Sequence, residues 1–186
     1  MKKINMKRKK PQISLEIASV SWTRLKGLKK RVEAATELTL ASLPENLLAA
    51  ASKAEIVLLL TTDKAVQKLN LNFRGVDKPT NVLSFPSFSR RELSREAKGE
   101  GEVHVGDLAM AYGTIQKEAK CEDKLLLDHV THLVIHGILH LFGFDHNTSS
   151  KAARMEKLER ELMVSLGLLD PYALLPSSKP PSRKSK

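Results

Sequence analysis

The chain has 186 residues, of which 41% are hydrophobic and 4% aromatic, and its formal net charge is +10 at pH 7. This length and apolar content suit one globular domain with a sizeable core. Cys121 is the only cysteine, so an intrachain disulfide is excluded. No signal peptide or membrane span is visible, and we therefore expect a cytoplasmic protein without membrane attachment.

The positive charge is concentrated at the two ends. Six basic residues lie within 1–10 and four within 179–186, neither stretch holds an acidic residue, and these ten equal the whole net charge. We expect a basic, disordered N-terminal arm over 1–10, a compact domain over 11–170, and a disordered tail rich in Pro, Ser and Lys over 171–186. Such arms suit a polyanion such as RNA, although two solubilising ends would have the same composition.

The spacing of apolar residues predicts four strands and about five helices. Ile13, Leu15 and Ile17, for example, alternate with polar residues as in a half-buried strand. The expected elements, in chain order, are a strand over 12–20, a helix over 22–43 closed by Pro44, a buried strand over 55–61, a helix over 63–73 capped by Asp63, a short strand over 82–85, an irregular excursion over 86–101, a strand over 102–112, and helices over 114–121, 125–142 and 149–166. Their irregular order predicts an α+β fold.

The helix expected over 125–142 carries an unusual set of histidines. His136 and His140 are four residues apart, so they lie on one face of the helix and can point at one ion. Gly143 can take the positive φ at which a helix ends and the chain turns back, which would bring in His146. Three neutral imidazoles with one open position describe a catalytic zinc site. Asp145 is a candidate acceptor for the outer nitrogen of a ligand imidazole, with a simple turn residue as the alternative.

Two alternatives arise on the same helix. A triad of His132, His136 and His140 would spread its ligands over about 12 Å, too far for one zinc ion bound at about 2.0–2.1 Å. We therefore expect His129 and His132 to make hydrogen bonds or to line the site. The zincin-like spacing also matches the metalloprotease run His-Glu-x-x-His-x-x-Gly-x-x-His, but Gly137 occupies the place of the glutamate that serves as general base.

Three motifs follow one another within residues 55–170. They are Asn70-Leu-Asn-Phe-Arg74-Gly-Val-Asp77-Lys-Pro79-Thr80-Asn81-Val82-Leu83-Ser84-Phe85, Gly106-Asp107-Leu108, and His136-Gly-Ile-Leu-His140-Leu-Phe-Gly143-Phe-Asp145-His146. In order and spacing, this set resembles the YbeY family. The departures are Asn81, where that family usually has an aspartate, and Phe144, where it has a tyrosine.

The resemblance implies a compact α+β domain with a mixed four-stranded sheet and a single-strand-specific, metal-dependent endoribonuclease activity. It also implies a role in ribosomal RNA processing, notably maturation of the small-subunit 3′ end, and in ribosome quality control. The implied partners are single-stranded RNA, ribosomal RNA and the small ribosomal subunit, without a nucleotide cofactor. One Zn²⁺ per chain would be held by His136, His140 and His146, and the family's functional arginine matches Arg74.

Chemistry supports a role for Arg74, but other functions stay open. A guanidinium remains protonated and can hold two phosphate oxygens, although a surface arginine at a helix end would look the same in the sequence. No general base is evident, so attack by a zinc-bound hydroxide and attack by the RNA 2′-hydroxyl are both open. The alternative functions are a non-catalytic ribosome assembly factor with a structural metal and, with less support, a zinc metallopeptidase.

Overall fold

A mixed four-stranded sheet forms the centre of the protein. The computed structural model describes residues 11–173, so the expected arm over 1–10 and all of the expected tail beyond residue 173 lie outside the described part. In space the strands are ordered β1 (Gln12–Ile17), β2 (Ala54–Thr61), β4 (Val103–Ala111) and β3 (Val82–Pro86). Strands β1 and β4 run parallel to β2, whereas β3 is an edge strand antiparallel to β4. The predicted α+β class and mixed sheet are confirmed.

Eight helices accompany the sheet within residues 11–173. They are α1 (Val20–Thr23), α2 (Leu28–Ala41), α3 (Glu45–Ala51), α4 (Asp63–Arg74), α5 (Arg90–Glu96), α6 (Tyr112–Cys121), α7 (Leu126–Leu141) and α8 (Ser149–Ser165). Five of them correspond to the expected helices. The number is larger because the sequence pattern missed one break and two short helices.

The helix expected over 22–43 is interrupted. Helix α1 ends at Thr23, and α2 begins only after Gly27, which has a φ of 80°. Few residues other than glycine tolerate that angle, so the chain changes direction there. The apolar periodicity continues across the break because both helices pack on the same core, which is why the pattern reads as one helix.

One helix cap differs from the expected one, and one helix was not expected. Helix α4 is capped by the Thr62 side chain, which accepts from the Ala65 backbone N–H, and Asp63 is already inside the helix. The Asp63 carboxylate accepts instead from the backbone N–H of Thr114, at the start of α6. Helix α5 lies in the expected irregular excursion, and its capping box between Ser89 and Glu92 is a local signal that apolar spacing alone does not register.

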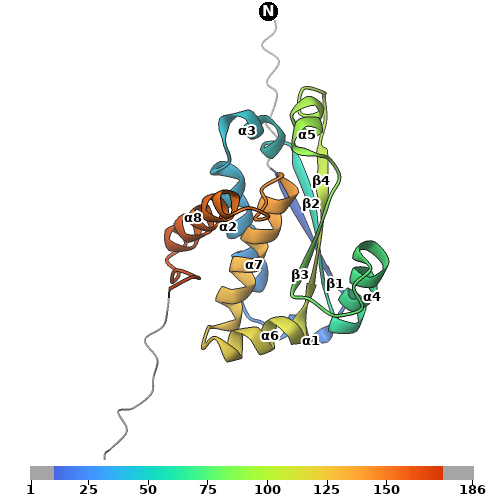
Figure 1. The fold of residues 1–186 in the computed structure, drawn as a ribbon, viewed down its shortest axis with the longest axis vertical. Helices are drawn as coiled ribbons and strands as arrows, with labels where there is room; N and C mark the ends of the chain where they lie inside the picture. The colour runs from blue at the N-terminus through green and yellow to red at the C-terminus, as the bar shows by residue number, and fades with distance from the viewer. Residues whose placement is uncertain (1–10, 174–186) are drawn as a thin grey trace, which may run out of the picture.

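Helices cover both faces of the sheet (Figure 1). Helix α7 packs on one face beside β3 and β4, with α2 and α8 around it. Helix α4 covers part of the other face, where Val66 meets Leu83 of β3 and Ala109 of β4. In β2 the residues that belong to the main core are buried and the alternate ones are only half-buried, as expected for a strand whose two faces are unequally covered. Edge strand β3 therefore lies between α4 and α7.

In the described part of the chain, no helix combines the length and the apolar character that crossing a bilayer requires. Helix α7, the most apolar, has 16 residues and carries four histidines on its length. Its apolar side chains are instead buried against the sheet and the neighbouring helices.

Candidate metal centre

Three histidines converge at the C-terminal end of α7. His136 and His140 stand one helical turn apart, their ring centroids are 4.5 Å apart, and their Nε2 atoms are 3.0 Å apart. His146 closes the group from beyond the helix, with its ring centroid 5.0 Å from that of His140. One ring nitrogen from each of the three lies within 4.8 Å of the others. The structure thus brings together all three histidines expected to bind metal.

The turn after α7 places His146. Gly143 has a φ of 75°, its N–H donates to the His140 carbonyl, and the Phe144 N–H donates to the Leu139 carbonyl. These two hydrogen bonds form a Schellman motif, which satisfies the last helical carbonyls and reverses the chain. The reversal also brings the Phe144 carbonyl to 3.0 Å from His140 Nδ1.

Hydrogen bonds at the outer nitrogens determine the tautomers of both helical imidazoles. His140 Nδ1 must carry a proton, because the Phe144 carbonyl can only accept. His136 Nδ1 donates to Glu159 Oε1 at 2.8 Å. In the neutral rings the two Nε2 atoms therefore present lone pairs to each other across 3.0 Å. Two facing acceptors are unfavourable unless an electron-pair acceptor lies between them, so this donor set fits a metal ion.

The protonation state also favours metal binding. Burial, together with the neighbouring His136 and His146, lowers the pKa of His140 from 6.5 to about 4. His140 is therefore neutral at pH 7, the form in which an imidazole binds metal. In a tetrahedral zinc site the ligand atoms lie roughly 3.3 Å apart, since each Zn–N bond is about 2.0–2.1 Å. The spacing of the histidine nitrogens is compatible with that size.

Glu159 of α8 was missed by the sequence analysis. Its side chain is only 1% exposed, and it accepts hydrogen bonds from His136, His132 and Tyr172. Burial raises the pKa of this carboxyl, but the three hydrogen bonds outweigh burial and lower it to about 2. The available signal was an acidic residue at an apolar position of α8, between Met155 and Leu162.

Among the contacts described within residues 11–173, neither of the other two expected site residues bonds to a ring of the three histidines. Asp145 accepts from the Asn147 N–H and from Lys151 Nζ, so the carboxylate that contacts a site imidazole is Glu159. Arg74 is exposed at the end of α4, on the other side of edge strand β3 from α7. Within residues 11–173 no hydrogen bond or ion pair joins Arg74 to the three histidines.

The packing around Gly137 leaves no room for the glutamate that serves as general base in metalloproteases. A Cβ atom at this position would lie 2.8 Å from Leu108 Cδ2 of β4. Gly137 therefore faces the core between α7 and the sheet, and its carbonyl accepts from Ser84 Oγ of β3 at 3.4 Å. A glutamate there would be forced against the sheet and not toward the histidines.

Comparison with known proteins shows the family of the chain. A family model described as Endoribonuclease YbeY matches residues 16–167, a span that contains β2 to β4 and all three histidines. The chain belongs to the YbeY family. Proteins named Endoribonuclease YbeY are 48% identical over 120 residues in Rhodopseudomonas palustris (64% of this chain, 70% of theirs) and 40% identical over 168 residues in Bradyrhizobium diazoefficiens (90% and 88%). Another from Bartonella quintana is 40% identical over 164 residues (88% and 98%).

One solved structure has a similar fold. A Thermotoga maritima protein studied in solution aligns with a TM-score of 0.50 and 21% identity, over 88% of this chain and 100% of its own. At that identity the likeness concerns the fold alone. It agrees with the YbeY-like arrangement of sheet and helices described above.

In this YbeY-family chain, the other two histidines of α7 make hydrogen bonds to carboxylates, and His132 shares Glu159 with His136. His129 Nε2 lies 2.9 Å from Glu118 Oε2, and His132 Nε2 lies 3.1 Å from Glu159 Oε2. Both make hydrogen bonds, as expected from their distance along α7. Asn81, where the YbeY pattern usually has an aspartate, donates to Glu118 at 3.0 Å. An amide suits this position because a second carboxylate would stand directly against Glu118.

Proposed function

We propose that this protein is a zinc-dependent, single-strand-specific endoribonuclease that acts on ribosomal RNA. The proposal rests on membership of the YbeY family, whose relatives carry the name endoribonuclease, together with the three converging histidines. Its proposed setting is the cytoplasm, with maturation of the small-subunit ribosomal RNA 3′ end and ribosome quality control as its tasks.

One zinc ion per chain would be held by His136, His140 and His146. When bound, the ion supplies positive charge that polarises a phosphoryl oxygen and activates water. The chain's own contribution is to keep both helical imidazoles neutral and oriented. Glu159 holds the proton on His136 Nδ1, and the Phe144 carbonyl holds the one on His140 Nδ1.

Arg74 is the proposed contact for the phosphate. It is exposed, it ends α4, and the ring of its neighbour Phe73 contacts Phe85 of β3 at a centroid distance of 5.1 Å. Ser84, the preceding residue of β3, reaches Gly137 on the other face. A single strand of RNA lying along the edge strand can therefore contact both sides of it. The ten basic residues of 1–10 and 179–186 would add sequence-independent attraction to such a strand.

Metal content decides the first half of the proposal. We expect mass spectrometry of protein purified without a His tag to find about one zinc per chain, and His140→Ala to lose it while remaining folded. His104→Ala is the matched control, because His104 pairs with Asp107 on β4, apart from the three histidines. Folded wild-type protein without any metal would contradict the hydrolytic mechanism.

Cleavage of single-stranded ribosomal RNA tests the second half. Wild-type protein should cut it and His140→Ala should not. Zinc-loaded protein that binds the RNA without cutting it would favour the alternative of a non-catalytic assembly factor. Cleavage of unstructured protein would favour a metallopeptidase, which the position of Gly137 against Leu108 argues against.

A further inference from the structure

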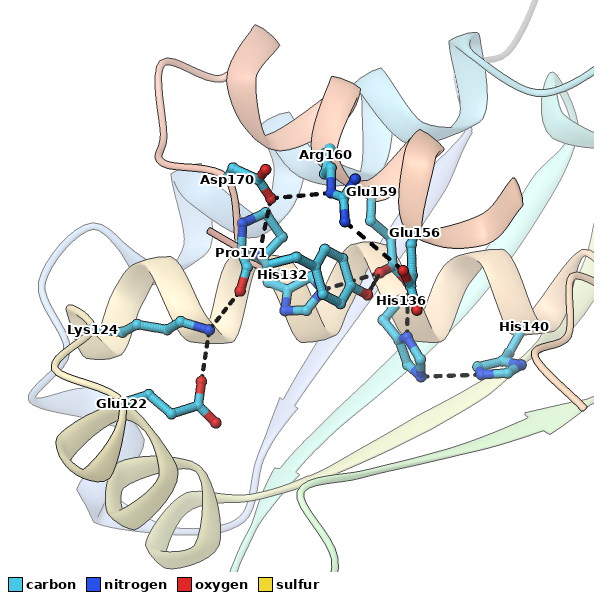
Figure 2. Close-up of polar contacts among 11 residues, drawn as sticks. Glu122, Lys124, His132, His136, His140, Glu156, Glu159, Arg160, Asp170 and Pro171 are labelled. Carbon is cyan, nitrogen blue, oxygen red and sulfur yellow. Dashed lines mark hydrogen bonds and ion pairs between the residues drawn. The ribbon is translucent and has the colours of Figure 1, made fainter. Parts of the chain in front are cut away.

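The two carboxylate oxygens of Glu159 accept hydrogen bonds from different residues. Oε1 accepts only from His136 Nδ1, at 2.8 Å, among the described contacts. Oε2 accepts from His132 Nε2, at 3.1 Å, and from the Tyr172 hydroxyl. Donors on Oε2 prevent the carboxylate from rotating, so Oε1 stays aimed at His136. Figure 2 shows Glu159 between His132 and His136, with the C-terminal segment beside it.

Glu159 contacts the outer nitrogen of His136, the one that faces away from His140. The side chain is also 1% exposed, so it lies behind the histidine group and not among the nitrogens that converge. A buried ionised carboxylate is costly unless its oxygens are hydrogen-bonded. Here His132 supports it, and the other nitrogen of His132, Nδ1, is buried without a partner among residues 11–173. Among the described residues, the ring of His132 therefore makes one hydrogen bond, the one to Glu159.

Tyr172 is held in place by the folded-back segment that follows α8. Lys124 Nζ, just before α7, donates to the Pro171 carbonyl at 2.8 Å. Asp170 accepts from the Tyr172 N–H at 2.9 Å and pairs with Arg160 Nε at 3.4 Å. Arg160 also lies over the Tyr172 ring, 5.1 Å from its centroid. Pro171 and Tyr172, assigned to the disordered tail by the sequence analysis, are thus fastened to α8 and to the loop before α7.

We propose that Glu159 is a positioning residue for the metal ligand His136, and that Tyr172 of the C-terminal segment fixes Glu159 in that role. The inference rests on the proposed metal dependence and extends it to two residues outside the three ligands. Partners of this kind orient a ligand imidazole and raise its basicity, and their loss typically weakens metal affinity about 10–100-fold.

Zinc affinity, measured by competition with a chromophoric chelator, tests this inference without RNA. We expect Glu159→Gln to weaken zinc binding about 10–100-fold, and Tyr172→Phe about three- to tenfold because two donors remain on the carboxylate. The matched controls are Glu161→Gln, which pairs with Lys157 on the exposed side of α8, and Tyr112→Phe, the chain's other tyrosine. Both should stay within about twofold of wild type, because their described partners, Lys157 and Gln116, are neither metal ligands nor contacts of Glu159.

The tautomer of His136 provides a second readout on metal-free protein. Nitrogen NMR should show the proton of His136 on Nδ1 in wild type and a mixture of tautomers in Glu159→Gln. Thermal unfolding of each metal-free variant checks the fold, and if Glu159→Gln does not fold, Tyr172→Phe carries the test. Affinities equal to wild type in both variants would overturn the inference, as would equal losses in the two controls.

Different results would contradict the nuclease proposal and the positioning role of Glu159 and Tyr172. Zinc bound with unchanged affinity by Glu159→Gln and Tyr172→Phe removes the positioning role and leaves the nuclease proposal standing. If zinc affinity falls as expected in the two variants but the wild-type protein does not cut RNA, the nuclease proposal is overturned and the positioning role stands. A wild-type protein that binds no zinc overturns both.

Discussion

At the scale of single residues, the histidine group shows how local spacing and distant contacts combine. The four-residue interval of His136 and His140 is sufficient to place both rings on one side of α7. Which nitrogen of each ring faces the ion depends on acceptors elsewhere, the Phe144 carbonyl and the Glu159 carboxylate. A ligand set can therefore be inferred from a helix, whereas its tautomers require the surrounding structure.

Arg74 gives a test of catalysis that is separate from metal binding. We expect Arg74→Ala to retain one zinc per chain and to lower kcat for RNA cleavage about 10²–10³-fold, the usual loss when one donor to a developing charge is removed. Lys68→Ala, an exposed cation on the same helix, is the control and should leave kcat nearly unchanged. Unaltered cleavage by Arg74→Ala would show that this guanidinium does not contact the reacting phosphate.

At the scale of elements, β4 depends on one glycine. The register between β2 and β4 shifts between Glu55 and Ile56, so β4 bulges at Val105, next to Gly106, which has a φ of 146°. A Cβ atom at Gly106 would lie 2.3 Å from the Phe85 carbonyl oxygen of β3, and 3.0 Å from Leu141 of α7. The Gly-Asp motif thus has a structural reason, because only glycine lets β3, β4 and α7 approach this closely.

Gly106→Ala should consequently be strongly destabilising. Backbone strain and displacement of the β3 backbone together predict a loss of about 3 kcal/mol or more in the free energy of unfolding. Gly167→Ala is the control, since Gly167 has a φ of 73° but open space around it and should cost only about 1–2 kcal/mol. Urea unfolding of the two variants measures the difference, and equal losses would mean that the contact with Phe85 is unimportant.

At the scale of the whole molecule, α7 and α8 unite the core with the histidine group. Both helices bury apolar side chains in the main core, and both also carry the polar residues that surround the site. Lowering the pH should therefore decrease the free energy of unfolding through ionisable groups in this region. Groups whose pKa is lowered by folding bind more protons in the unfolded chain, so their protonation favours unfolding.

The metal-free protein should lose stability in two steps as the pH falls. The pKa of His140 is lowered from 6.5 to about 4, so the free energy of unfolding should decrease as the pH drops from about 6.5 to 4. The pKa of Glu159 is lowered from 4.5 to about 2, so its contribution is present above about pH 4.5 and is lost toward pH 2. Urea unfolding at several pH values measures both steps.

His140→Ala should flatten the upper step, and His104→Ala should not. A stability that is constant between pH 7 and 5 in wild type, or an unchanged slope in His140→Ala, would contradict this assignment.

Much of the fold could be predicted from local pattern. Strands β1 to β4 and five helices appear where apolar periodicity and turn residues indicated them, because each strand or helix buries one face. The break at Gly27 and the cap at Thr62 were not predicted, since alternative local conformations are compatible with the same pattern. The strand order β1-β2-β4-β3 was also beyond local pattern, because pairing is decided by contacts distant in sequence.

The sequence by itself was enough to predict that the three histidines lie together and that a glycine turn brings in the third. It was also enough to recognise the resemblance to the family to which the chain belongs. These features are short-range, and helical geometry with a positive φ is enough to relate them. Only the tertiary structure decided that Glu159, 23 residues from His136, accepts the hydrogen bond from the outer N–H of that ring, and that Tyr172 fastens Glu159. The physical reason is that a buried carboxylate is stable only where separate helices converge to supply its hydrogen bonds.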